Sequence, residues 1–131
     1  MMARIAVLGA GSWGTALAVH LGRIGHDVRL WARDRALVGD MTARRANAVY
    51  LPDVTLPETV LVTDAIDEAL GGTDLVVSAV PSHGCRMVVR QAAPHVRPRA
   101  TIVSATKGLE ADTHMRMSEV IRSEVRGRPA S

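Results

Sequence analysis

The sequence contains no phenylalanine, and its aromatic side chains are limited to Trp13, Trp31 and Tyr50. A hydrophobic core must therefore be built from alanine, valine, leucine, isoleucine and methionine. Hydrophobic residues make up 47% of the chain, which excludes a disordered composition. A length of 131 residues is typical of one domain and is sufficient to bury a core.

Cysteine is almost absent as well. The single cysteine, Cys85, excludes an internal disulfide and is typical of a reducing compartment. The chain begins directly with a strand pattern, without the layout of a signal peptide. No apolar run approaches the roughly 20 residues that span a bilayer. We therefore expect a cytoplasmic protein without membrane insertion.

No base is evident beside Cys85, so we expect this thiol to fill the core rather than act as a nucleophile.

Lysine is the third scarce residue, because Lys107 is the only lysine among 16 basic residues and all the others are arginine. The formal net charge is +3. Nucleic-acid binding usually needs a basic stripe, often with stacking aromatics. Here the arginines are scattered among acidic residues, so we predict no nucleic-acid partner. The five histidines show no metal-ligand spacing, so we predict no metal site.

Strand and helix patterns alternate along the whole chain. Strand patterns cover residues 5–8, 27–31, 60–62, 74–80 and 100–104. Helical patterns cover residues 13–24, 35–45 and 113–125. Asp34 is a candidate cap for the second of these helices, and Asp64 is expected to cap a further short helix that stops at Gly71. Another helix is indicated by an apolar face made of Cys85, Val88, Val89 and Ala92. Residues 47–59, with two prolines, are expected to form a loop, and residues 127–131 to fray. The alternation predicts an α/β domain over residues 1–131, a Rossmann-type doubly wound parallel sheet of about five strands with helices on both faces.

A glycine motif, G-x-G-x-x-G, follows the first strand pattern and opens the first helix pattern. In this context it is typical of dinucleotide binding. Gly9 permits the tight turn, Gly11 lets the backbone approach a pyrophosphate, and Gly14 allows the helix to pack closely on the strand. Ser12 and Trp13 would present N–H groups to the phosphates at the helix N-terminus.

The end of the second strand pattern indicates which cofactor is preferred. An NAD-selective site usually has an acidic residue there for the ribose 2′-hydroxyl. Here the first acidic residue is Asp34, which is also a candidate helix cap, and Arg33 precedes it. Arg33 either pairs with a ribose 2′-phosphate or faces solvent. A guanidinium is well suited to phosphate, so the sequence favours NADP(H), with NAD(H) also accepted.

Five ordered segments resemble the bacterial NAD(P)-dependent glycerol-3-phosphate dehydrogenases. They are Gly9–Ala18, Leu30–Arg33, Arg45–Pro52, Val80–His83 and Ala105–Glu110. The resemblance implies an oxidoreductase that reduces dihydroxyacetone phosphate to sn-glycerol 3-phosphate with NAD(P)H, for glycerophospholipid synthesis. It also implies that Lys107 contacts both cofactor and substrate.

Combined with the glycine motif, the resemblance implies one set of site residues. The predicted cofactor-binding residues are Gly9, Gly11, Ser12, Trp13, Gly14, Arg33, Tyr50, Pro81, Ser82 and Lys107, and Lys107 is also the predicted substrate-binding residue. The resemblance also implies a second, helical domain that carries the general acid/base, and we expect that domain to lie outside these 131 residues. We therefore expect no catalytic residue within the chain, and a truncated chain that binds cofactor without turnover. The sequence also departs locally at Gly84-Cys85, where relatives often carry larger apolar or aromatic residues.

The residues alone allow two other interpretations of the function. One is the cofactor domain of a different Rossmann dehydrogenase or reductase that acts on a 3-hydroxy acid. The other is a standalone nucleotide-binding module without catalysis. For the truncated chain, an unpaired sheet edge beside the fifth strand would invite dimerisation or aggregation, so a homodimer is an expected partner.

Overall fold

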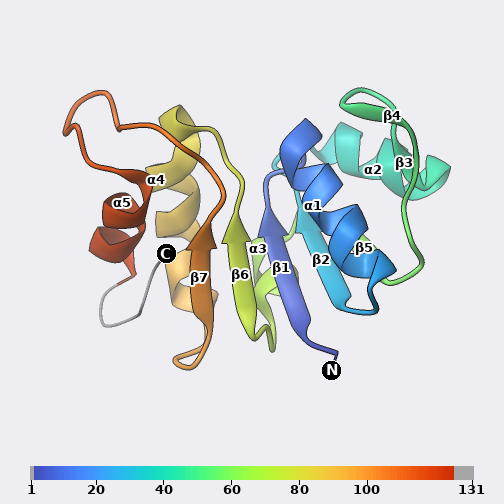
Figure 1. The fold of residues 1–131 in the computed structure, drawn as a ribbon, viewed down its shortest axis with the longest axis horizontal. Coiled ribbons are helices and arrows are strands. Elements are labelled where there is room, and N and C mark those ends of the chain that lie inside the picture. Colours follow the sequence, from blue (N-terminus) through green and yellow to red (C-terminus); the bar gives the residue numbers. More distant parts are fainter. Residues whose placement is uncertain (1, 126–131) are drawn as a thin grey trace.

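The computed structural model describes residues 2–125 of the chain, and its centre is a five-stranded parallel sheet (Figure 1). The strands are β1 (Arg4–Leu8), β2 (Asp27–Trp31), β5 (Val60–Thr63), β6 (Leu75–Ser78) and β7 (Thr101–Ser104). They lie in the order β5-β2-β1-β6-β7. The predicted Rossmann-type architecture is confirmed, and all five strand patterns correspond to strands of this sheet.

Helices cover both faces of the sheet, which explains why the central strands β1 and β6 are mostly apolar. One face carries α1 (Ser12–Arg23) and α2 (Arg35–Arg44), and the other carries α3 (Ile66–Leu70), α4 (Ser82–Ala92), the 3-10 helix η1 (Ala93–His95) and α5 (Met117–Glu124). Along β1, Ile5 and Val7 pack in the first core, whereas Ala6 and Leu8 pack in the second. The two cores therefore follow from the alternation of side chains along each strand.

The order of the strands creates a crevice at the centre of the sheet. From β1 the chain moves outward to β2 and then β5 by way of α1 and α2. It then returns through α3 to β6, which pairs with the opposite edge of β1. Since the connections leave β1 and β6 toward opposite faces, the carboxyl ends of these strands border the position where doubly wound sheets bind ligands.

The prediction of a loop over residues 47–59 is wrong for part of its length. The strands β3 (Ala46–Asn47) and β4 (Leu51–Thr55) pair in an antiparallel two-stranded ribbon that lies apart from the main sheet (Figure 1). Pro52 is exposed in this isolated ribbon, where a missing N–H donor is tolerated. No residue of β4 is fully buried, so the alternation that usually reveals a strand is absent.

Of the two predicted helix caps, one differs from the structure and one agrees with it. Asp64 does not cap α3, because its carboxylate accepts a hydrogen bond from Arg35 Nε at 3.1 Å. Thr63 Oγ1 instead accepts the N–H of Ala65 at 3.0 Å. The prediction at Asp34 is confirmed, because its carboxylate accepts the N–H groups of Ala36 at 2.9 Å and Leu37 at 3.2 Å.

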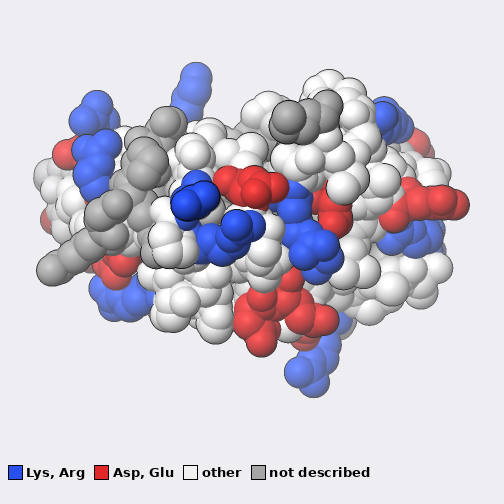
Figure 2. All heavy atoms as spheres, turned by 90° about the horizontal axis from the view of Figure 1, so that it is seen from below, with Lys and Arg blue, Asp and Glu red and all other residues white. Residues whose placement is uncertain are grey.

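The face of the molecule at which the strands begin carries charges of both signs (Figure 2). Arg4 and Arg29 pair with Asp27 at 3.0 and 3.5 Å, and Arg97 lies 3.7 Å from Asp74. Such partly exposed pairs contribute little to stability. The interleaving of arginine with acidic residues in the sequence is therefore retained on this face.

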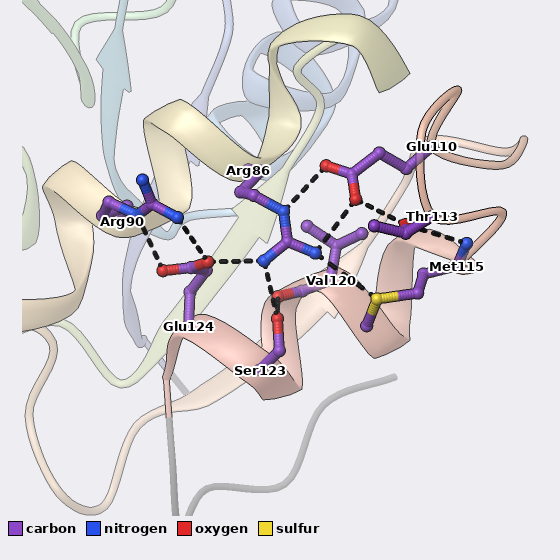
Figure 3. Close-up of polar contacts among 8 residues, drawn as sticks. All are labelled: Arg86, Arg90, Glu110, Thr113, Met115, Val120, Ser123 and Glu124. Atoms are coloured by element: carbon purple, nitrogen blue, oxygen red, sulfur yellow. Dashed lines mark hydrogen bonds and ion pairs between the residues drawn. The ribbon is translucent and has the colours of Figure 1, made fainter.

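A cluster of ion pairs joins α4 to α5 and to the segment after β7 (Figure 3). Arg86 on α4 donates two hydrogen bonds to the Glu110 carboxylate, from Nε at 2.8 Å and from Nη2 at 3.0 Å. Arg86 also pairs with Glu124 on α5, and Glu124 accepts two further hydrogen bonds from Arg90 at 3.0 and 3.1 Å. Bidentate arginine–carboxylate pairs are among the stronger polar contacts in proteins. Hydrogen bonds from Arg86, with one from Thr113, lower the pKa of Glu110 to about 2.

This cluster explains why the last helix begins later than predicted. The helical pattern predicts a start at Thr113, but α5 begins at Met117. The Thr113 hydroxyl donates to Glu110 at 2.6 Å, and His114 then adopts a left-handed conformation with φ of 58°. That conformation is incompatible with a right-handed helix, so α5 forms only after the turn. The predicted buried face of α5 is confirmed at Met117, Val120, Ile121 and Val125.

The low pKa of Glu110 predicts an acid-sensitive contribution to stability. A carboxylate whose pKa is depressed by folding contributes fully above its unfolded pKa, and this contribution is lost as the pH falls through the folded pKa. We expect the free energy of unfolding, measured by urea denaturation, to decrease between pH 4.5 and about 2 more steeply in the wild type than in Glu110→Gln. The variant cannot protonate at this position, whereas all other carboxylates titrate in both proteins. Parallel pH profiles would contradict the assignment.

Candidate functional site

A pocket of about 540 Å³ lies at the carboxyl ends of β1, β2 and β6. Three successive strand ends contribute to its lining, together with Tyr50 from the segment between β3 and β4. The lining comprises residues 9–14, residues 31–34 with Leu37, Tyr50, and residues 79–81 with His83, Gly84 and Val88. The pocket thus occupies the central crevice of the sheet, as expected for a ligand site in this topology.

The glycine turn forms the wall of this pocket between β1 and α1. Gly9 has φ of +109°, and a Cβ atom there would lie 2.9 Å from the carbonyl oxygen of Ala79. A Cβ atom on Gly14 would lie 1.9 Å from the carbonyl oxygen of Gly9, so any side chain there would displace the helix from the strand. By contrast, a Cβ atom on Gly11 would meet no atom within 4 Å. Gly11 therefore leaves open space in the pocket beside the first turn of α1.

The start of α1 presents polar backbone to this space. Gly11 is the N-cap residue of α1, and the helix begins at Ser12. The first N–H groups of a helix have no partner within it and carry the positive end of its dipole. Trp13 is 58% exposed, and its indole N–H donates to the carbonyl of Ala105 at 2.9 Å, across the end of the sheet. The pocket therefore combines an anion-attracting wall with a fixed aromatic side chain.

Arg33 lies at the mouth of the pocket, directly after the buried end of β2. Its Nη2 atom is 3.8 Å from the sulfur of Met87, an exposed residue on α4. A thioether is only a weak acceptor, so this contact leaves the guanidinium able to bind a stronger anionic partner. Asp34, next to it, has its carboxylate committed to the cap of α2.

Asn47 was not predicted as a site residue, yet it lies behind the glycine turn. It is 0% exposed, and its side chain contacts Ala10, Thr15 and Tyr50. Ser12 Oγ adds a second link by donating to the Tyr50 carbonyl at 2.9 Å. Asn47 lies in Arg45–Pro52, one of the five segments that carry the resemblance, but the segment lacks the periodicity of a strand, so no secondary-structure pattern marks this asparagine. The apolar walls formed by Leu37 and Val88 were likewise not predicted.

Lys107 and Ser82 are not among the residues that line the large pocket. Lys107 lines a smaller pocket of about 290 Å³, together with residues that include Ser104 and Arg116. Ser82, at the start of α4, lies beside Gly108, since a Cβ atom on that glycine would be 3.8 Å from the Ser82 side chain. The structure therefore brings Lys107 and Ser82 to the same edge of the sheet as the large pocket. Pro81, the N-cap residue of α4, does line the large pocket.

Cys85 is fully buried in the core under α4, as predicted. Burial raises the pKa of its thiol, which keeps the sulfur protonated and unreactive at neutral pH. Within residues 2–125, no three histidine, cysteine, aspartate or glutamate side chains are grouped so that they could hold a metal ion. In the same part of the chain, no helix has both the length and the apolar character needed to cross a membrane.

Comparison with known proteins gives consistent matches over nearly the whole chain. The family profile described as "NAD-dependent glycerol-3-phosphate dehydrogenase N-terminus" matches residues 4–130. A glycerol-3-phosphate dehydrogenase [NAD(P)+] of Koribacter versatilis is 50% identical over 125 residues, which are 95% of this chain and 37% of that protein. A second such enzyme, from Salinibacter ruber, is 45% identical over 130 residues, 99% of this chain and 38% of that protein.

A solved structure agrees with these sequence matches. The crystal structure of glycerol-3-phosphate dehydrogenase from Coxiella burnetii superimposes with a TM-score of 0.92 at 36% identity, covering 98% of this chain and 39% of that one. The chain thus spans under two fifths of the length of each of these three relatives. Since the family profile covers the entire sheet and its helices, the chain belongs to the family of NAD-dependent glycerol-3-phosphate dehydrogenases, as their N-terminal domain.

Proposed function

We propose that this chain is the cofactor-binding part of an enzyme that reduces dihydroxyacetone phosphate to sn-glycerol 3-phosphate with NAD(P)H. The observation that carries the proposal is the pocket of about 540 Å³ whose wall is the glycine turn at the start of α1. The names of the matching relatives support the substrate and the reaction. The family match favours this function over a different Rossmann reductase or a standalone nucleotide-binding module.

The residues around the pocket fit a dinucleotide. The open space at Gly11 admits a pyrophosphate, and the first turn of α1, with Ser12 and Trp13, supplies N–H donors. Gly9 and Gly14 maintain the turn that makes this approach possible. The adenosine portion would lie toward the end of β2, where Arg33 could bind a ribose 2′-phosphate. Tyr50, Pro81 and Ser82 would complete the cofactor site.

Lys107 is the proposed substrate residue of this domain. When bound, the cofactor supplies the hydride for reduction of the ketone. An ammonium group close to the substrate can hold its phosphate or polarise its carbonyl. Lys107 follows β7 at the same edge of the sheet as the cofactor pocket, in a segment whose Gly108 lies beside Ser82. This position supports a role at the border between cofactor and substrate.

The proposal includes a cellular place and a partner. Cys85 is buried and unpaired within the described residues, so we infer that the protein works in the reducing cytoplasm. At the edge of the sheet, β7 pairs only with β6 among the strands of residues 2–125. An exposed strand edge readily pairs with another chain, so a homodimer would form there.

The first prediction from this proposed function concerns the choice of cofactor. Arg33→Asp should weaken NADPH binding by about 1.5–3 kcal/mol, because hydrogen bonds to charged groups contribute that much. This loss corresponds to a roughly 10- to 150-fold rise in Kd. Binding of NADH should change much less. Isothermal titration of both cofactors measures the difference, and Arg99→Asp, an exposed charge reversal at the opposite ends of the strands, is the matched control. Equal losses for the two cofactors would remove Arg33 from a 2′-phosphate site.

The second prediction concerns the glycine turn. Gly11→Val places a branched side chain in the open space that the pyrophosphate requires, without a clash inside the protein. We expect cofactor binding to be lost while the thermal midpoint of unfolding stays close to that of the wild type. Gly39→Val is the matched control, because a Cβ atom on Gly39 also meets nothing within 4 Å but lies on α2, away from the pocket. Unchanged affinity of Gly11→Val in a cofactor fluorescence titration would contradict the proposed site.

The third prediction concerns turnover. Reduction of a ketone needs a proton donor within hydrogen-bond reach of the developing alkoxide, and such acid catalysis contributes roughly 10²–10⁴-fold in rate. We assign Lys107 to substrate contact and assign no described residue to that donor role. We therefore expect the 131-residue chain to bind NADPH but to oxidise it with dihydroxyacetone phosphate no faster than a blank. Turnover at an ordinary dehydrogenase rate by a chain verified by mass spectrometry would assign Lys107 a direct catalytic role.

A further inference from the structure

The buried amide of Asn47 makes hydrogen bonds through both of its polar atoms. Nδ2 donates to the Ala10 carbonyl at 2.9 Å and to Thr15 Oγ1 at 2.9 Å, and Oδ1 accepts the N–H of Tyr50 at 3.1 Å. The orientation of the amide is unambiguous, because a carbonyl oxygen can only accept and a backbone N–H can only donate. Asn47 and Thr15 are both 0% exposed, so these contacts are shielded from water.

The contact with Ala10 controls the peptide that faces the pyrophosphate site. Ala10 stands between Gly9 and Gly11 in the glycine turn, and its carbonyl shares a planar peptide unit with the N–H of Gly11. In a trans peptide these two groups point in opposite directions, and no peptide bond of the described chain is cis. Because Asn47 holds the Ala10 carbonyl, the N–H of Gly11 is directed away from Asn47.

The contact with Tyr50 adds a second constraint on the same turn. The Tyr50 backbone is held at its N–H by Asn47 and at its carbonyl by the hydroxyl of Ser12, at 3.1 and 2.9 Å. Asn47 itself is part of β3, which is more than 30 residues distant from the glycine turn in sequence. The segment between β3 and β4 is therefore joined to the first turn of α1 through one asparagine and one serine.

We infer that Asn47 is a positioning residue for cofactor binding, which holds the Ala10–Gly11 peptide so that its N–H serves the pyrophosphate. This inference rests on the proposed function of the pocket. Asn47 itself would not contact the cofactor, because it lies behind the turn and does not line the pocket. Its effect would be transmitted through the peptide plane that it holds.

The test compares two variants that each disturb one hydrogen bond of this buried amide. Asn47→Asp replaces the donor facing Ala10 with a carboxylate oxygen, which repels the carbonyl. Thr15→Val removes the partner of the other N–H and leaves the contact with Ala10 intact. We expect the Kd for NADPH, measured by titration calorimetry on the 131-residue chain, to rise about tenfold or more in Asn47→Asp, the effect of losing one good hydrogen bond. In Thr15→Val it should rise less than about twofold, although unfolding in urea should be easier for both variants.

A second ligand separates positioning from a general loss of structure. Adenosine 2′-monophosphate lacks the pyrophosphate, so its affinity, followed by NMR titration, should be similar in the wild type and in Asn47→Asp. If Asn47→Asp does not fold, Asn47→Ser removes the amide without adding charge and should give the same selective loss for NADPH. Equal loss of both ligands, or equal effects of the Asn47 and Thr15 variants on NADPH, would overturn the inference and leave the proposed function intact. A wild-type chain that binds neither ligand would overturn both.

Discussion

The structure depends most on the close approach between the glycine turn and its neighbours. Gly14 stands so near the carbonyl of Gly9 that a Cβ atom would be 1.9 Å from it, and Gly9 itself presses against Ala79 at the end of β6. Helix α1 can begin immediately beside the end of β1 only because both positions lack side chains. That placement directs the N-terminus of α1 at the crevice between β1 and β6. The pocket, its anion-attracting wall and the path of the chain toward β2 all follow from this contact.

The regular part of the fold could be predicted from sequence because its signals are local. Short apolar runs such as that of β1 identify strands buried on both faces, and the glycine spacing identifies the turn. The ribbon of β3 and β4 could not be predicted in this way, because β4 has no fully buried residue and Pro52 interrupts its pattern. The start of α5 was also missed, since Thr113 is engaged by Glu110, whose conformation is held by Arg86, 24 residues earlier in the sequence. A pattern confined to one helix carries no information about such a partner.

The residues of the candidate site likewise fall into those that local sequence patterns predict and those that they do not. Residues whose role follows from backbone geometry, such as Gly9, Gly11 and Gly14, are recognisable by spacing alone. Asn47 is different, because its importance comes from hydrogen bonds to Ala10 and Thr15 that bring distant segments together. An exposed and a buried asparagine are indistinguishable in a sequence without periodicity. The cavity wall at Leu37 and Val88 has the same origin, because it is formed only when α2 and α4 pack on their strands.

Helix α4 links the two edges of the proposed site. Its first residues, Pro81 and Ser82, border the cofactor pocket and the Lys107 segment respectively, while Arg86, one turn further, holds Glu110 in a bidentate pair. At the other end of that segment, the Thr106 hydroxyl donates to the Val80 carbonyl at 2.7 Å, just before α4 begins. Lys107 therefore stands in a segment held on one side by the connection between β6 and α4 and on the other side by α4, although its nearest regular element in sequence is β7. The ion pair of Arg86 and the hydrogen bond of Thr106 engage the side chains of Glu110 and Thr106, on either side of Lys107, so other residues hold the segment in which the proposed substrate lysine stands.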